Sequence, residues 1–109
     1  MQTDRIQQLE KFLEEDANDA FTLYALALEY IKVHALVKAK EFFSILYKLH
    51  PGYLPLYYQF GNLLATLNEK EKANELYNKG IALAKNKNDI KTLNELKEAY
   101  NSLNGIEED

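Results

Sequence analysis

The sequence has no cysteine, only four glycines and two prolines, and no long apolar run. Without cysteine there can be no disulfide framework and no thiolate metal site, and this composition fits a reducing cytosol. No apolar stretch approaches the roughly 20 residues that a membrane-spanning helix needs, and the polar start lacks the regions of a signal peptide. We therefore expect a soluble, cytoplasmic protein without a membrane partner.

Positive charge is also scarce. The chain carries 13 Lys and Arg against 17 Asp and Glu, which gives a formal net charge of -4. This is the wrong sign for a protein that is held to a phosphate backbone by counterion release, so no nucleic-acid partner is expected. What the chain does have is 109 residues of which 47% are hydrophobic, enough for a single domain with a buried core.

Apolar residues recur at steps of three and four residues almost throughout, and no strand pattern competes with this period. Residues that favour helix dominate the composition, which supports the same interpretation. The pattern predicts six amphipathic helices, with spans of roughly 4–15, 19–33, 36–50, 54–67, 69–85 and 89–103.

Punctuation residues mark the ends of these helices. The firmest boundary is the segment 50–55, because its prolines and its glycine end one helix and suit the first turn of the next. Asn68 with Glu71 has the spacing of a capping box, and Asp19 can cap the helix that follows it. Gly105 follows the last apolar step, as a C-terminal stop should.

The most informative feature is self-similarity at a shift of 34 residues, which lays 20–53 over 54–87 without a gap. Large residues coincide with large ones and small with small. Where two antiparallel helices cross, one side must be short for the backbones to approach, and large neighbours fill the flanking grooves. The small residues that coincide are Ala27 with Gly61 and Ala39 with Ala73.

This pattern resembles the tetratricopeptide repeat family, in which an aromatic or Leu, then Leu, a small residue and Tyr mark a first helix. Ala and, four residues on, Phe or Tyr mark the second helix, which Pro closes. The first copy here has Leu23, Leu26, Ala27, Tyr30, Ala39, Phe43 and Pro51, and the second has Tyr57, Phe60, Gly61, Leu64, Ala73, Tyr77 and Lys85.

The resemblance implies an all-α fold of antiparallel helical hairpins stacked in a right-handed superhelix of about six helices. We expect one domain over 1–109, organised as an N-terminal capping helix 4–15, repeats 20–53 and 54–87, and a C-terminal capping helix 89–103.

Residues that carry chemistry are nearly absent. Only His34 and His50 could act as bases at neutral pH, and they lie at opposite ends of one predicted helix, roughly 24 Å apart at 1.5 Å per residue. We expect both to be solvated end residues. No Gly-rich phosphate loop, nucleophile elbow or metal-ligand spacing occurs in the sequence. We therefore expect no enzyme activity, no cofactor and no metal site.

The resemblance implies instead a protein-binding module or scaffold, because such arrays commonly bind extended peptides in the concave groove lined by their first helices. Ala65 and Glu98 would also face this groove. An apolar stripe at helical spacing can equally fill the core or mediate self-association, so these alternatives stay open. The expected peptide-binding residues are Phe21, Tyr24, Leu28, Ile31, Tyr58, Gln59, Asn62 and Asn94.

Some members of the family bind a partner's terminal carboxylate through five Lys, Asn and Arg residues. Only Lys91 fits that requirement in this sequence, so we do not expect that activity here. The five matching places hold Tyr24, Leu28, Gln59, Lys91 and Glu95.

A second feature keeps a structural alternative open. Val37 and Ile45 occupy places where the second copy has Glu71 and Lys79, so their side chains should form an apolar stripe that faces outward. Exposed apolar patches are often contact sites. The alternative function is therefore a structural homo-oligomer, for example a homodimer through Val37 and Ile45 or through the concave groove.

Overall fold

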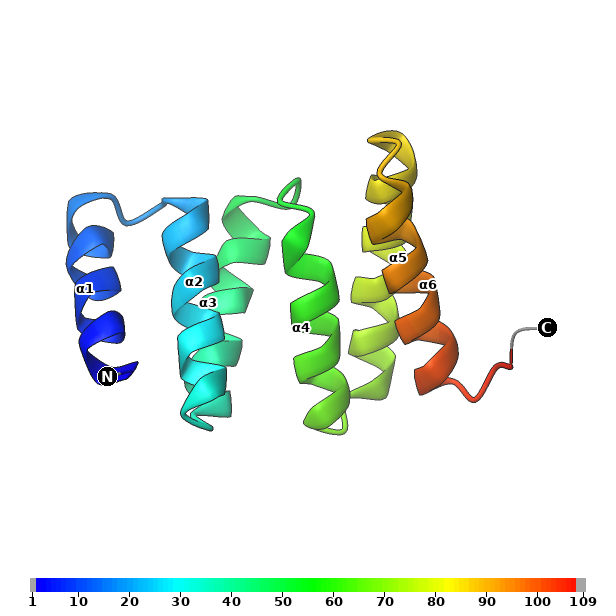
Figure 1. Cartoon of the computed structure of the whole chain (residues 1–109), viewed down its shortest axis with the longest axis horizontal. Helices are drawn as coiled ribbons and strands as arrows, with labels where there is room; N and C mark the ends of the chain where they lie inside the picture. The colour runs from blue at the N-terminus through cyan, green and yellow to red at the C-terminus, as the bar shows by residue number, and fades with distance from the viewer. Residues whose placement is uncertain (1, 108–109) are drawn as a thin grey trace. The chain divides into compact units, whose positions relative to one another are not determined.

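The computed structural model describes residues 2–107, and helices make up most of this part of the chain (Figure 1). Within it there are six helices and no strand, which confirms the predicted all-α class. Each helix agrees with its predicted span to within two residues at either end. Met1, Glu108 and Asp109, which the predicted domain includes, lie outside the described residues. The helices are α1 (Gln2–Glu15), α2 (Ala20–Lys32), α3 (Leu36–Leu49), α4 (Pro55–Thr66), α5 (Lys70–Asn86) and α6 (Ile90–Leu103).

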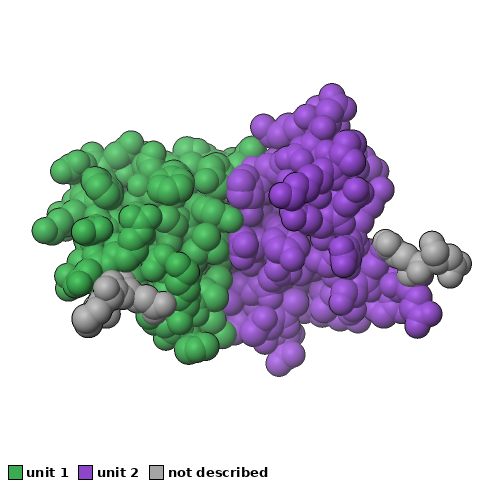
Figure 2. Space-filling view, viewed as in Figure 1, with its two compact units in different colours: residues 1–53 green, residues 54–109 purple. Residues whose placement is uncertain are grey.

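The chain divides into two compact units, Met1–Tyr53 and Leu54–Asp109, which Figure 2 colours separately. This division falls at the boundary predicted between the two repeats. Unit 1 contains α1, α2 and α3, and unit 2 contains α4, α5 and α6. Each unit therefore consists of one helical hairpin and one further helix.

In unit 1, α2 packs against both α1 and α3. The rings of Tyr30 on α2 and Phe42 on α3 stack with their centroids 5.6 Å apart and their planes 7° from parallel. Burial of these apolar faces on α2 is the main force that holds the three helices together. Its core cluster joins side chains from α1 and α2, namely Ile6, Leu9, Ala25 and Leu26.

In unit 2, α5 packs against α4 and α6, and α4 also touches α6. The predicted small crossing residues are confirmed, because a Cβ at Gly61 would lie 2.4 Å from Cε1 of Tyr77, and Ala73 is completely buried. Gly80 is a second close approach that the sequence pattern did not predict. A Cβ there would lie 2.6 Å from Cβ of Tyr57 and 2.9 Å from Cδ1 of Leu96, so α4 and α6 both approach α5 at this point.

Four helix ends close in the same way. His34, Asn68 and Asn88 have positive φ values of 60°, 63° and 56°, and Gly105 has 67°. At His34 the backbone N–H donates to the carbonyl of Ile31, and the next N–H donates to that of Tyr30. The same pair of bonds recurs at the other three ends, which identifies a Schellman motif each time. The predicted stop at Gly105 is confirmed.

The predicted capping box at Asn68 is wrong. Asn68 is the left-handed residue that ends α4, and Glu69 occupies the N-cap position of α5 without a side-chain cap bond. Asn suits both an N-cap and a left-handed helix end. Here the Glu69 N–H donates to the Leu64 carbonyl, a bond that closes α4 and makes Asn68 part of its end. The predicted cap at Asp19 is confirmed, because its carboxylate accepts the Thr22 N–H at 2.9 Å.

Candidate functional site

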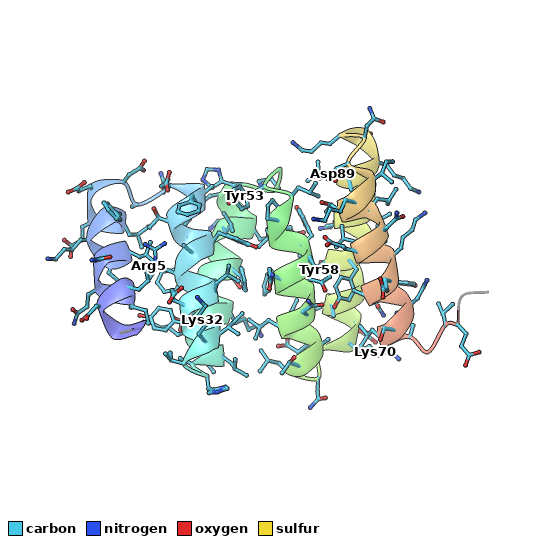
Figure 3. The ribbon with its side chains drawn as sticks, viewed as in Figure 1. Arg5, Lys32, Tyr53, Tyr58, Lys70 and Asp89 are labelled. Atoms are coloured by element: carbon cyan, nitrogen blue, oxygen red, sulfur yellow. The ribbon has the colours of Figure 1, made fainter. Side chains whose placement is uncertain are left out.

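A groove of about 560 Å³ lies on unit 2, with walls formed by α4 and α6. Its α4 wall consists of residues spaced four and three apart, which lie on one face of a helix. Figure 3 shows Tyr58 on α4 and Asp89 at the start of α6. The lining residues are Tyr58, Asn62 and Ala65 from α4, Tyr77 from α5, and Glu95, Glu98, Ala99, Ser102 and Leu103 from α6.

Tyr77 positions the amide side chain in this groove. Its hydroxyl donates a hydrogen bond to Oδ1 of Asn62 at 2.5 Å. Burial, with a smaller contribution from the neighbouring Tyr58, raises the pKa of Tyr77 to about 12, so the phenol stays protonated at neutral pH and remains a donor. The bond occupies the side-chain oxygen of Asn62 and leaves its NH₂ group to donate to another molecule.

The charged residues of the groove are all of one sign. Glu95 and Glu98 are exposed, and within residues 2–107 neither makes an ion pair. By contrast, Glu29 on α2 pairs with Lys32 at 2.9 Å. The described residues that line the groove include no Lys, Arg or His. The groove therefore presents two solvated carboxylates beside an oriented amide.

In unit 2 the structure brings together two of the four predicted site residues. Tyr58 and Asn62 are half-buried and line the groove. Gln59 is half-buried and Asn94 is exposed, and both lie outside the lining. Of the further groove-facing positions, Ala65 and Glu98 are both in the lining.

In unit 1 the four predicted site residues lie along α2. Phe21 is 58% exposed, while Tyr24, Leu28 and Ile31 are half-buried, so none of them belongs to the fully buried core. Tyr24 nevertheless packs within its unit, because its ring lies 5.4 Å from that of Tyr53 and 6.3 Å from that of Phe43. It therefore contributes to packing as well as to the surface.

The sequence reasoning missed several residues of the groove, chiefly on α6. Successive residues on a helix are turned by about 100°, and α6 presents the face with Glu95 and Ser102 to the groove instead of Asn94. That face follows from the spacing of the buried Leu93 and Leu96, which lie on another side of the same helix. The repeat pattern predicted only a packing role for Tyr77. Its ring lies against Gly61, so its hydroxyl comes within hydrogen-bonding distance of the next residue, Asn62, at the groove.

A smaller cavity of about 370 Å³ lies on unit 1 between α1 and α2. Two exposed rings border it, Phe12 at 55% exposure and Phe21 at 58%. Phe21 was expected at a binding surface, whereas Phe12 was not singled out by the sequence. Charged groups at its edge include Arg5 and Asp19.

The two histidines differ in their surroundings. His34 is exposed, as predicted, but His50 is half-buried, and its Nε2 donates to the carbonyl of Asn18 at 2.5 Å. This bond ties the end of α3 to the loop before α2, so His50 is not simply a solvated end residue. Among residues 2–107, no group of three or more His, Cys, Asp and Glu is placed to hold a metal ion. In the same part of the chain, no helix has the length and apolar character that crossing a membrane requires.

The apolar stripe on α3 faces outward, as predicted. Val37 is 72% exposed and Ile45 is 43% exposed. Leu49, four residues after Ile45 on the same helix, is also exposed, at 42%. Val37, Ile45 and Leu49 are therefore a second group of exposed apolar residues on unit 1.

No protein-family model matches the sequence, and no curated protein matches it significantly. Solved structures do match. The crystal structure of a tetratricopeptide repeat domain protein from Salinibacter ruber is 35% identical, with a TM-score of 0.76, over 82% of this chain and 99% of that one. A solution structure of a tetratricopeptide repeat domain protein from the same organism gives 34% identity and a TM-score of 0.77, over 86% of this chain and 95% of that one.

A crystal structure of MamA is similar at lower identity. It is 23% identical, with a TM-score of 0.75, and the match covers 96% of this chain and 56% of that chain. At this identity the likeness concerns the fold alone. The Salinibacter ruber structures, in contrast, match at more than 30% identity over almost their whole length. Together with the 34-residue repeat, this similarity shows that the chain belongs to the tetratricopeptide repeat family.

Proposed function

We propose that this chain is a non-enzymatic interaction module that binds a peptide or helical segment of another protein, and that the groove on unit 2 is a binding site. Tetratricopeptide repeat folds generally mediate interactions between proteins and generally are not enzymes. The observation that supports the proposal most is the amide of Asn62, which Tyr77 holds with its NH₂ group unoccupied in an open groove.

A peptide has the chemistry that this groove can recognise. Every residue of an extended chain offers a carbonyl, and the Asn62 NH₂ can donate to one of them. Tyr58 offers a ring with a polar tip, which suits a surface that is partly wet. Because Asn62 is already held by Tyr77, less conformational freedom is lost when the partner binds.

The size of the groove sets the expected strength of binding. Nine residues line it, so we expect an interface at or below about 1,200 Å², the low end of the usual range. Affinity should then be on the order of micromolar. Such a module would hold its partner transiently.

Unit 1 supplies a second candidate surface in this proposal. Phe21, Leu28 and Ile31 offer apolar contact along α2, with Phe21 the most exposed of them. We assign Tyr24 a mixed role, because its contacts with Phe43 and Tyr53 mean that truncating it would also loosen unit 1.

The test uses peptides selected from a displayed library of random nonapeptides. The affinity of a selected peptide is measured by fluorescence anisotropy for the wild type, Asn62→Ala and Asn78→Ala. Asn78 is an exposed residue of α5 outside the groove, so it provides a matched control. We expect a loss of about fivefold or more only for Asn62→Ala, in line with the loss of one hydrogen bond. Equal affinities for all three proteins would rule out the groove as the binding site.

The exposed stripe on α3 favours a second function, which is self-association. Val37 at 72% exposure and Ile45 at 43% would be covered in a symmetric dimer. The double substitution Val37→Glu with Ile45→Lys copies the second repeat and should yield monomers with unchanged helicity. Light scattering at high micromolar concentration decides the matter, because a wild type that is already monomeric excludes this function.

A further inference from the structure

The groove on unit 2 combines an aromatic wall, an oriented amide and two carboxylates without a balancing cation. We propose that its occupant is an extended segment that carries a Lys or Arg side chain beside Glu95 and Glu98, with an apolar side chain three or four residues away. This inference rests on the proposed function and specifies the chemistry of the partner.

Glu95 and Glu98 differ from several other glutamates of the chain because no cation neutralises them among residues 2–107. Lysines neutralise glutamates elsewhere on the chain, for example Lys79 with Glu75 on α5. Glu95 and Glu98 make no such pair among residues 2–107, although both lie at the groove. A cationic side chain placed there gains attraction without displacing an existing partner.

The aromatic wall favours the same occupant. Tyr58 lies in the lining with its ring half-buried, and Tyr77 lies beneath Asn62. A guanidinium or ammonium group is attracted to the face of a Tyr ring, and Arg also stacks on it. An acidic side chain would meet like charge at Glu95 and Glu98 instead.

The order of residues along the groove gives the spacing. Helices α4 and α6 run in the same direction, downward in Figure 1. Tyr58 and Glu95 therefore belong to the earlier part of each wall, and the apolar residues Ala65 and Leu103 belong to the later part, beside Ser102. From Glu95 to Leu103 the helix rises about 12 Å, at 1.5 Å per residue. An extended peptide covers that distance in three or four residues, at about 3.3 Å each.

The expected effect is moderate, because both carboxylates are solvent-exposed. Exposed ion pairs are weak and are screened by salt. We expect Glu95→Gln with Glu98→Gln to weaken binding of a cationic peptide about three- to tenfold at low ionic strength, and less at about 0.5 M NaCl.

The experiment selects binders from the displayed nonapeptide library with the wild type, with Glu95→Gln/Glu98→Gln and with Glu14→Gln/Glu107→Gln. The last variant also removes two negative charges, but from exposed positions outside the groove, so it controls for the change in net charge. We expect Lys and Arg to be enriched, three or four residues from an apolar residue, for the wild type and the control variant only. The best Arg peptide is then compared by fluorescence anisotropy with its citrulline counterpart, which has the same shape without the charge, and citrulline should bind the wild type three- to tenfold more weakly.

Any of three results would overturn the inference. If selected peptides bind at the groove without a preference for Lys or Arg, or if citrulline binds as well as Arg, the cationic partner is wrong while the peptide-binding function stands. If the wild type selects no peptide at all, the proposed function fails, and the inference fails with it.

Discussion

The ring of Tyr77 on α5 lies against Gly61 on α4, so closely that a Cβ at Gly61 would be 2.4 Å from Cε1 of the ring. The hydroxyl of the same side chain donates to Asn62, the next residue along α4. One buried side chain thus serves both the crossing of two helices and the arrangement of the groove. A glycine at position 61 allows the tyrosine to approach, and the tyrosine then orients the amide.

We predict that Gly61→Ala destabilises the protein by about 1–2 kcal/mol, because the Tyr77 ring must shift, and that this cost outweighs the gain in helix propensity. Gly80→Ala should cost more, because its Cβ would lie 2.6 Å from Cβ of Tyr57, which cannot move without its backbone. Gly52→Ala is the control, since nothing lies within 4 Å of a Cβ there. Urea denaturation measures all three, and equal effects would show that the close approaches do not limit packing.

His34→Gly should stabilise the protein by about 0.5–1 kcal/mol. His34 has a φ of 60°, a left-handed conformation that costs a residue with a Cβ more than it costs glycine. The larger freedom of glycine in the unfolded chain offsets part of this gain. Ser44→Gly, in the exposed middle of α3, should instead destabilise by about 0.5–1 kcal/mol. If both variants melt at lower temperature to the same extent, the turn at His34 carries no strain.

The 34-residue register makes a different prediction about two alanines. Ala73→Leu should cost about 1–3 kcal/mol by overpacking, because Ala73 is completely buried. Ala65→Leu should cost much less, because Ala65 is half-buried at the edge of the groove. Thermal melts followed by circular dichroism separate the two. Equal shifts in Tm would mean that the register is misplaced.

Acid should remove the contribution of two helix caps. The Thr22 hydroxyl and backbone N–H hold the pKa of Asp19 below its usual 3.8, and the Thr92 backbone N–H and hydroxyl do the same for Asp89. A carboxylate whose pKa is lower in the folded state stabilises that state above its unfolded pKa, and loses this effect as the pH falls through the folded pKa. The wild type should therefore exceed Asp19→Asn/Asp89→Asn in urea midpoint at about pH 7, and the gap should narrow below about pH 4. A constant gap would show that the two carboxylates do not titrate abnormally.

Helices and their crossings could be predicted because both depend on local period and on side-chain size. Small residues at equivalent positions of the two copies predict that two helices approach closely there, as at Ala27, Gly61 and Ala73. Gly80 could not be found in this way, because the equivalent place in the first repeat holds Leu46, which is fully buried. The need for a glycine at position 80 comes from the approach of α4 and α6 to α5, and the repeat does not contain this information.

The groove was only partly predictable for a related reason. Tyr58 and Asn62 follow from the register of α4, which the repeat defines. The contribution of α6 depends on how this helix is rotated against α4. Leu93 and Leu96 lie two residues later than a further shift of 34 from Tyr57 and Phe60 would place them, so the repeat does not define that rotation. Asn94 was therefore expected where Glu95 lines the groove. The predicted capping box at Asn68 was wrong for a different reason, because an Asn side chain suits both an N-cap and a left-handed helix end.

The most direct test of peptide binding at the groove of unit 2 is a map of amide chemical shifts in two-dimensional NMR while a selected nonapeptide is added to the wild type. We predict that the shifts which change cluster at Tyr58, Asn62, Glu95, Glu98 and Ser102, on the two walls of the groove. The same titration of Asn62→Ala should need several-fold more peptide. Changes confined instead to α3 around Val37 and Ile45, or to α1 around Phe12, would contradict the assignment of the groove as the binding site.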